Sequence, residues 1–214
     1  IATVSSTGVV TAVSSGTATI RYTVAATGAC TTAATSDLSV VVTAAPDAGT
    51  VTGTAALCEG DTTTLASDGD TGGAWSSSDM TIATVNATTG LVTSLAEGTT
   101  TITYTVVATG SCTVNATSSL MVAVTAAPDA GTVTGTAALC EGDTSNLSSD
   151  GDAGGVWSSL DTAIATVSST GVVTTVSSGT ATIRYTVAAT GSCTTDATSD
   201  LVVTVSTNPI AEAG

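Results

Sequence analysis

Residues 98–106 read Gly-Thr-Thr-Thr-Ile-Thr-Tyr-Thr-Val, and residues 179–187 read Gly-Thr-Ala-Thr-Ile-Arg-Tyr-Thr-Val. In the first stretch the apolar residues Ile102, Tyr104 and Val106 alternate with threonines. Successive side chains of a β-strand point to opposite faces, so this alternation predicts a strand with one buried and one exposed face. In the second stretch the same alternation places Arg184 on the exposed face, where water solvates its charge.

The two stretches belong to a repeat of about 82 residues that extends over the chain. The segment Ala-Ala-Pro-Asp-Ala-Gly-Thr-Val-Thr-Gly, which begins at Ala44, returns at Ala126. Residues that recur at matching places are Trp75 and Trp157; Tyr22, Tyr104 and Tyr185; Cys30, Cys112 and Cys193; and Pro46, Pro128 and Pro209. This period is too long for a solenoid and suits a small independent β-sandwich.

The recurring prolines mark the expected domain boundaries. Residues 46–127 and 128–207 are predicted to be complete domains, and residues 1–45 the C-terminal half of a preceding one. Residues 208–214 are expected to start the next repeat, so the chain is interpreted as a section of a longer repeat protein. The linkers are short and contain proline, which restricts its own φ and the residue before it, so we expect stiff joints and a rod.

Within residues 46–127, short apolar or threonine-rich runs alternate with turn residues. The expected strands are 50–53, 62–66, 74–77, 82–85, 91–95 and 99–108, followed by a last strand with Leu120, Val122 and Val124 on one face. The fold class is therefore all-β, with tandem immunoglobulin-like β-sandwich domains. Trp75 and Tyr104 are expected to pack between the two sheets, and a sugar-stacking platform is the alternative interpretation of these aromatic residues.

The composition excludes several classes of function. The formal net charge is −15, and Arg21 and Arg184 are the only basic residues, so nucleic acids and anionic membrane surfaces are not expected partners. Histidine and lysine are both absent, which removes Ser-His-Asp and Cys-His catalysis, Schiff-base chemistry and histidine-based metal sites. No apolar run is long enough to span a membrane in this segment. The chain is predicted not to be an enzyme and to need no cofactor.

Cysteine is the residue type that could brace these domains. Each complete domain has two cysteines, and the half domain has one. We predict one disulfide within each complete domain, Cys58–Cys112 and Cys140–Cys193, which leaves Cys30 unpaired in this stretch. The alternative, a thiolate metal site, has no CxxC pair to support it.

Acidic residues gather in two turns that precede the tryptophan strands. Asp68-Gly69-Asp70 and Asp150-Gly151-Asp152 recur in the repeat, with Asp61 and Asp143 nearby in the sequence. Calcium binds carboxylate clusters in flexible loops, but Asp-Gly is also ordinary turn chemistry. A plain turn is the main interpretation, and a calcium site is the alternative. A glycosidase interpretation is disfavoured because the carboxylates have no other catalytic groups around them.

Three motifs together resemble a known family. They are Trp-Ser-Ser-Ser-Asp at 75–79, Ile-Ala-Thr-Val at 82–85 with its Thr-Gly turn, and the Gly-Thr-x-Thr-Ile-x-Tyr-Thr-Val strand. The combination is similar to the bacterial immunoglobulin-like group 2 domain of surface adhesins and other surface proteins. The resemblance covers nearly the whole chain and implies an extracellular sandwich domain used as a stalk or spacer, and sometimes as an adhesive tip.

The main functional hypothesis is a structural repeat of an extracellular bacterial filament or cell-surface stalk, a rod braced by disulfides. Its partners would be the neighbouring repeats of the same chain, and identical chains where filaments form. The alternative is an adhesin module that binds a glycan or a host protein. A third hypothesis is self-assembly, in which strands from neighbouring molecules complete the partial domains.

Overall fold

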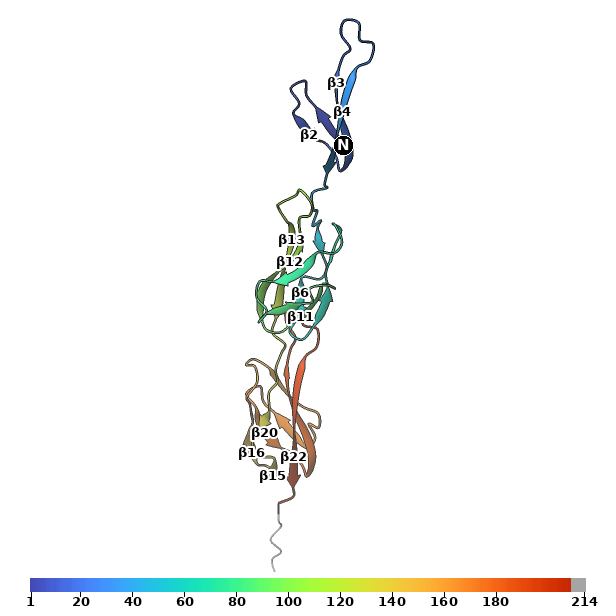
Figure 1. The fold of residues 1–214 in the computed structure, drawn as a ribbon. Coiled ribbons are helices and arrows are strands. Elements are labelled where there is room, and N and C mark those ends of the chain that lie inside the picture. The colour runs from blue at the N-terminus through green and yellow to red at the C-terminus, as the bar shows by residue number, and fades with distance from the viewer. Residues whose placement is uncertain (209–214) are drawn as a thin grey trace, which may run out of the picture.

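The computed structural model describes residues 1–208, and the predicted start of a further repeat lies outside them except for Asn208. We name the repeats the first unit (residues 1–45), the second unit (46–127) and the third unit (128–207). Within the described residues the regular structure is entirely β, with no helix. No helix that is long and apolar enough to cross a membrane is found among them. The three units follow one another along an extended molecule (Figure 1).

The strands repeat in the same order from unit to unit. The first unit has β1 (Ala2–Val4), β2 (Val10–Ala12), β3 (Gly16–Val24) and β4 (Ala34–Val42). The second has β5 (Val51–Thr52), β6 (Ala56–Cys58), β7 (Thr62–Thr64), β8 (Ala66–Ser67), β9 (Ala74–Ser77), β10 (Ala83–Val85), β11 (Leu91–Ser94), β12 (Gly98–Val106) and β13 (Ala116–Thr125). The third has β14 (Val133–Thr134), β15 (Ala138–Cys140), β16 (Thr144–Asn146), β17 (Ser148–Ser149), β18 (Val156–Ser159), β19 (Ala165–Val167), β20 (Val172–Thr175), β21 (Gly179–Val187) and β22 (Ala197–Ser206).

Each complete unit is an immunoglobulin-like sandwich. In the second unit one sheet has the order β6-β13-β12-β9, and the facing sheet has the order β10-β11-β7. The pair β5-β8 forms a small extra ladder, and the third unit repeats all three sheets. One pairing in the larger sheet is parallel: β6 lies beside the end of β13, with Cys58 opposite Thr125.

The predicted alternation is confirmed in the central strand. Ile102, Tyr104 and Val106 on β12 are all buried, at 0%, 7% and 9% exposure. On β13, Val122 and Val124 are buried and Leu120 packs against the same core. The single apolar face on each strand forms the interior of the sandwich, because both sheets turn these faces toward one another.

Trp75 and Tyr104 are core residues, as the sequence predicts. Both are 7% exposed, and their ring centroids lie 4.7 Å apart. The Tyr104 hydroxyl donates a hydrogen bond to the backbone oxygen of Asp70 and accepts one from the Gly73 amide, each at 2.9 Å. The aromatic pair thereby fastens the turn before β9 to the centre of the sheet.

The first unit consists of two hairpins, β1-β2 and β3-β4, and has no counterpart of β9 among its residues. Tyr22, the counterpart of Tyr104, is therefore 71% exposed. A groove of about 590 Å³ is lined by Tyr22, Ile20 and Leu38, among other residues. In the second unit the counterpart of Tyr22, Tyr104, packs instead against Trp75 on the neighbouring strand β9.

Arg184 lies on the outer face of β21 and faces Asp200 of β22 in the register. Its Nε and Nη2 atoms donate to the two carboxylate oxygens of Asp200, each at 2.7 Å. Hydrogen bonding from Arg184 lowers the pKa of Asp200 below its ordinary value. This effect is larger than the rise in the pKa that desolvation causes. Arg21 and Asp37 form the same pair in the first unit.

This pair predicts a pH dependence. Because the pKa of Asp200 is lower in the folded chain than in the unfolded chain, the pair stabilises above the unfolded pKa of about 3.9. The stabilisation is lost as the pH falls through the folded pKa, and it is small because both side chains are well exposed. An NMR titration should give Asp200 a midpoint below the ordinary range, and Arg184→Gln should return it to that range. Equal midpoints in the two proteins would contradict the pairing.

Candidate functional site at the joint between two repeats

The connection between β21 and β22, residues 188–196, forms a loop at the end of the third unit that faces the second unit. Two local features shape it. Gly191 has a φ of +59°, a value that glycine adopts without strain, and the Cys193 amide donates to the oxygen of Thr190 in the same turn. The Asp196 carboxylate accepts a hydrogen bond from the Ala189 amide at 2.8 Å. The loop therefore has a defined shape that presents Ser192 and Cys193 to the preceding unit.

Ser192 connects the loop to two strands of the second unit. Its hydroxyl donates to the backbone oxygen of Leu57 on β6 at 2.6 Å. The hydroxyls of Ser192 and Thr125 are hydrogen-bonded at 2.9 Å, and Thr125 is the last residue of β13. The Cys193 sulfur lies 3.3 Å from the oxygen of Ala126, in the linker. The loop thus packs along the linker and reaches the end of the second unit.

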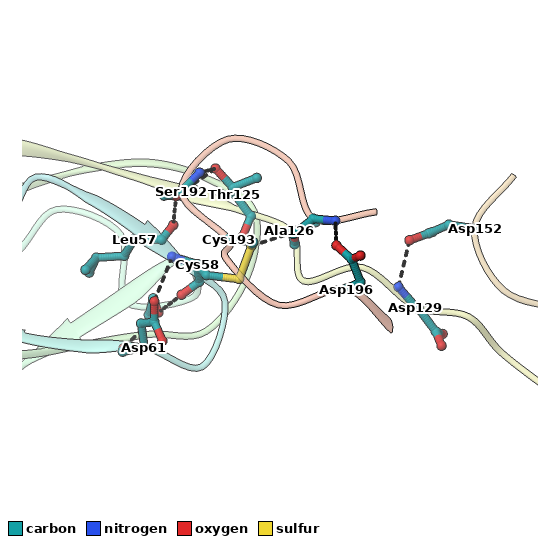
Figure 2. Close-up of a disulfide and its surroundings, with 12 residues drawn as sticks. Leu57, Cys58, Asp61, Thr125, Ala126, Asp129, Asp152, Ser192, Cys193 and Asp196 are labelled. Carbon is teal, nitrogen blue, oxygen red and sulfur yellow. Dashed lines mark hydrogen bonds between the residues drawn. A yellow bond between two sulfur atoms is a disulfide. The ribbon is translucent and has the colours of Figure 1, made fainter. Parts of the chain in front are cut away.

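A disulfide joins Cys58 of the second unit to Cys193 of the third (Figure 2). The two Cα atoms are 4.7 Å apart, although the residues are separated by 135 positions in the sequence. Cys193 is 8% exposed, so its sulfur is largely shielded from solvent. The consecutive units are therefore attached twice, once by the linker and once by this bridge.

The predicted disulfides Cys58–Cys112 and Cys140–Cys193 are wrong. Cys58 lies beside Thr125, at the end of β13, whereas Cys112 lies just before the start of that strand. The strand has ten residues, so the two cysteines are at opposite ends of the sandwich, roughly 30 Å apart at about 3.3 Å per residue. A disulfide needs Cα atoms within about 7 Å, so the bridge within one unit cannot form.

The cysteines fall into two positional classes. We call Cys58 and Cys140 edge cysteines, because each ends the short strand that pairs in parallel with the last strand of its unit. We call Cys30, Cys112 and Cys193 loop cysteines, because each lies in the loop after the tyrosine-bearing strand. Among the described residues, Cys30, Cys112 and Cys140 form no disulfide. The structure therefore departs from the predicted pairing at Cys112 and Cys140 as well as at Cys58 and Cys193.

The acidic residues named as calcium candidates have other roles in the structure. Asp68 and Asp70 accept hydrogen bonds from the Thr50 and Asp47 amides, and Asp61 accepts one from the Cys58 amide. Their counterparts Asp150, Asp152 and Asp143 do the same in the third unit. No group of three or more His, Cys, Asp or Glu residues suited to a metal ion is found in residues 1–208. Asp68 and Asp70, and their counterparts Asp150 and Asp152, thus hold the start of each complete unit against its turn.

The position of the bridge depends on β6, a strand for which the sequence carries no signal. β6 was not expected, because three residues of sequence Ala-Leu-Cys carry no alternation that predicts a strand. Its parallel pairing with the last strand places the edge cysteine at the end of the unit where the linker leaves. The loop cysteine lies at the opposite end, so an edge cysteine can meet only the loop cysteine of the next unit.

Comparisons with solved structures give several neighbours of low sequence identity. Domains 1–6 of the surface layer protein SbsC are 16% identical, with a TM-score of 0.32, and the match covers 98% of this chain and 38% of that one. A C-terminal fragment of intimin, solved in complex with an intimin-binding domain, is 17% identical, with a TM-score of 0.40. That match covers 72% of this chain and 62% of the fragment. A Ca²⁺-stabilised adhesin, which helps an Antarctic bacterium bind ice, is 19% identical, with a TM-score of 0.35. That match covers 90% of this chain and 58% of the adhesin chain.

The chain therefore spans about two fifths to three fifths of the lengths of these neighbours. No curated protein sequence is matched. The profile of the bacterial Ig-like domain (group 2) matches twice, at residues 51–118 and 132–199. These two matches fall on the two complete sandwiches and together cover more than half of the sequence. The chain belongs to the bacterial immunoglobulin-like domain family of group 2.

Proposed function

We propose that this chain is a non-enzymatic spacer segment of an extracellular bacterial stalk or filament. In this proposal residues 46–127 and 128–207 are consecutive domains of a rod, and a disulfide fixes the joint between them. The observation that carries the proposal is the Cys58–Cys193 bridge, because it connects two units and stabilises their relative orientation.

The bridge matters because a second attachment restricts the relative motion of two domains more than a short linker with proline does by itself. Interfaces between domains of one chain are commonly small, and relative motion is the default expectation. Here the linker and the disulfide are two separate attachments, and Ser192 adds hydrogen bonds to Leu57 and Thr125 between them. Two attachment points remove most bending about the linker, so the pair moves as one body.

The composition supports an extracellular location and a mechanical role. Disulfides persist in oxidising environments such as the cell exterior. The net charge of −15 keeps an exposed polymer soluble and resists collapse of the rod onto itself. The absence of histidine and lysine leaves few of the side chains that enzymes use for acid–base or covalent catalysis.

Small-angle X-ray scattering tests the joint. With the bridge intact, the second and third units should keep one relative orientation, so the range of shapes should be narrow at this joint. The double variant Cys58→Ser and Cys193→Ser keeps the linker but loses the bridge, so its ensemble should bend and its average maximum dimension should fall. The matched control is Cys30→Ser with Cys112→Ser, which leaves this joint untouched and should scatter like the unmodified chain. If the double variant without the bridge is as straight as the unmodified chain, the proposed role of the bridge is wrong.

A further inference from the structure

The backbone hydrogen bonds of Cys140 match those of Cys58. The Cys140 amide donates to the Asp143 carboxylate at 3.0 Å, as the Cys58 amide donates to that of Asp61 at 3.2 Å. The Cys140 oxygen accepts from the Thr175 hydroxyl at 2.8 Å, and the Cys58 oxygen accepts from Ser94 at 2.7 Å. Cys140 is also paired in parallel register at the end of its unit. The third unit therefore has an edge cysteine in the geometry of the bridged one.

The surroundings of Cys112 likewise reproduce those of Cys193. The Cys112 sulfur lies 3.4 Å from the oxygen of Ala44 in the first linker, where Cys193 lies 3.3 Å from that of Ala126. The Ser111 hydroxyl is hydrogen-bonded to Thr43 at 3.3 Å, as Ser192 is bonded to Thr125.

The turns match as well. Gly110 has a φ of +62°, and Gly191 has a φ of +59°. The Cys112 amide donates to the oxygen of Thr109 at 3.1 Å, as the Cys193 amide donates to that of Thr190 at 3.0 Å. The loop is docked on the linker before it even though its sulfur has no partner in residues 1–208.

We infer that Cys140 and Cys112 are two halves of further bridges of the Cys58–Cys193 type, each made with a neighbouring repeat of the same kind. Cys140 pairs with the loop cysteine of a repeat placed after residue 208. Cys112 pairs with the edge cysteine of a front half that completes the first unit. Every joint of an array of these repeats is then covalently bridged. Cys30, also a loop cysteine, pairs in the same way with the edge cysteine of the repeat before its own.

Formation of each bridge is a two-electron oxidation. Two S–H bonds break and one S–S bond forms. The two electrons and the two protons convert a disulfide oxidant, such as oxidised glutathione, to two thiols. This inference uses the same bridge as the proposed function, but it does not depend on whether that bridge stiffens the joint.

The first test extends the chain at its C-terminal end. Residues 1–208 are followed by a copy of residues 46–127, so that the copied proline takes the place of Pro209. Cys112→Ser in the original and Cys58→Ser in the copy leave five cysteines, each in a distinguishable peptide. After oxidation with a glutathione buffer, free thiols are alkylated and the digested chain is analysed by mass spectrometry. The expected pairs are Cys58–Cys193 and Cys140 with the copied Cys112, and Cys30 should be alkylated.

The matched control replaces the copied Cys112 with serine, and Cys140 should then be fully alkylated. An alkylated Cys140 in molecules whose Cys58–Cys193 bridge has formed would overturn the inference and leave the proposed function standing. A Cys140–Cys193 pair would overturn both, because it occupies the Cys193 sulfur that the bridge to Cys58 needs. If Cys58–Cys193 itself does not form in this chain, both are overturned.

A second test examines Cys112 independently. A copy of residues 128–163 is placed directly before Ile1, which supplies the missing front half of the first unit and a copied edge cysteine. With Cys140→Ser in the original, Cys112 should pair with the copied Cys140. Tyr22 should become shielded from solvent at the same time, because the copied residues supply the counterpart of β18, whose Trp157 packs against Tyr185 in the third unit. Alkylation of Cys112 in a chain whose Tyr22 is shielded from solvent would overturn the inference for this joint.

Discussion

Reduction of the Cys58–Cys193 bridge should lengthen the fully stretched chain by roughly 450–490 Å. The bridge connects residues that are 135 positions apart, and an extended chain reaches at most about 3.3–3.6 Å per residue. When the chain is pulled from its two ends, tension passes from residue 58 directly to residue 193. Residues 59–192 then carry no load, so unfolding them adds no length.

Single-molecule force spectroscopy measures this difference directly. Handles attached through terminal protein tags avoid any chemistry at cysteine. The oxidised chain should show extension of its ends alone, whereas the reduced chain should release the second and third units in separate steps. The Cys58→Ser variant should behave as the reduced chain under all conditions. Equal total lengths in the oxidised and reduced chains would mean that the bridge does not lie in the load path.

Gly69→Ala should destabilise the second unit by about 2–3 kcal/mol, which lowers its melting temperature by roughly 10–20 °C. A β-carbon at residue 69 would lie 2.4 Å from the Gly49 nitrogen and 2.5 Å from the Asp47 oxygen. Both contacts are to backbone atoms, so no side chain can rotate away to relieve them. The backbone has to move, and the amide hydrogen bonds of Asp68 and Asp70 weaken as it does.

Differential scanning calorimetry on the whole chain can assign this effect. The third unit is unchanged and supplies an internal reference transition. Gly151→Ala should produce the matching loss in the third unit, because its β-carbon would meet the same backbone atoms. Thr71→Ala, an exposed position in the same turn, should leave both transitions within about 0.5 kcal/mol. A Gly69→Ala chain that melts like the Thr71→Ala chain would contradict the close packing of the two turns.

Local chemistry was enough to predict the sandwich core. The alternation around Ile102 and Tyr104 identifies the buried face without knowledge of the partner strand, since only one face of each strand is apolar. Trp75 follows for a similar reason, because a large apolar side chain in a strand is placed where it is removed from water. These predictions depend on the period of the sequence and are confirmed by the burial of all three residues.

The pairing of cysteines could not be obtained in the same way. It depends on which end of the sandwich each sulfur occupies, and this is a property of strand direction rather than of spacing. The expected strand at 62–66 is two short strands that pair with different partners, β7 with β11 and β8 with β5. The β6 strand just before them has no sequence pattern that predicts it. Without β6, nothing in the sequence places Cys58 beside Thr125.

The role of the carboxylates in the acidic turns could not be predicted from the sequence either. Sequence alone leaves Asp68 and Asp70 as either turn residues or metal ligands, since both functions use carboxylates near glycine. The structure shows that they accept hydrogen bonds from amides of residues about 20 positions earlier. To predict that role, one must know which backbone segment lies against the turn. The structure shows that it is the segment around Gly49, which closely approaches Gly69.

The bridge also closes residues 58–193 into a covalent ring, and a ring survives one cut. Hydrolysis of any single peptide bond between these two cysteines, including one in the exposed linker, opens the ring but leaves both ends of the molecule connected through sulfur. Two cuts are needed before the chain can part, provided that the cystine stays oxidised. A surface protein attacked by proteases would therefore keep its length and its attachment after damage that would sever an unbridged chain.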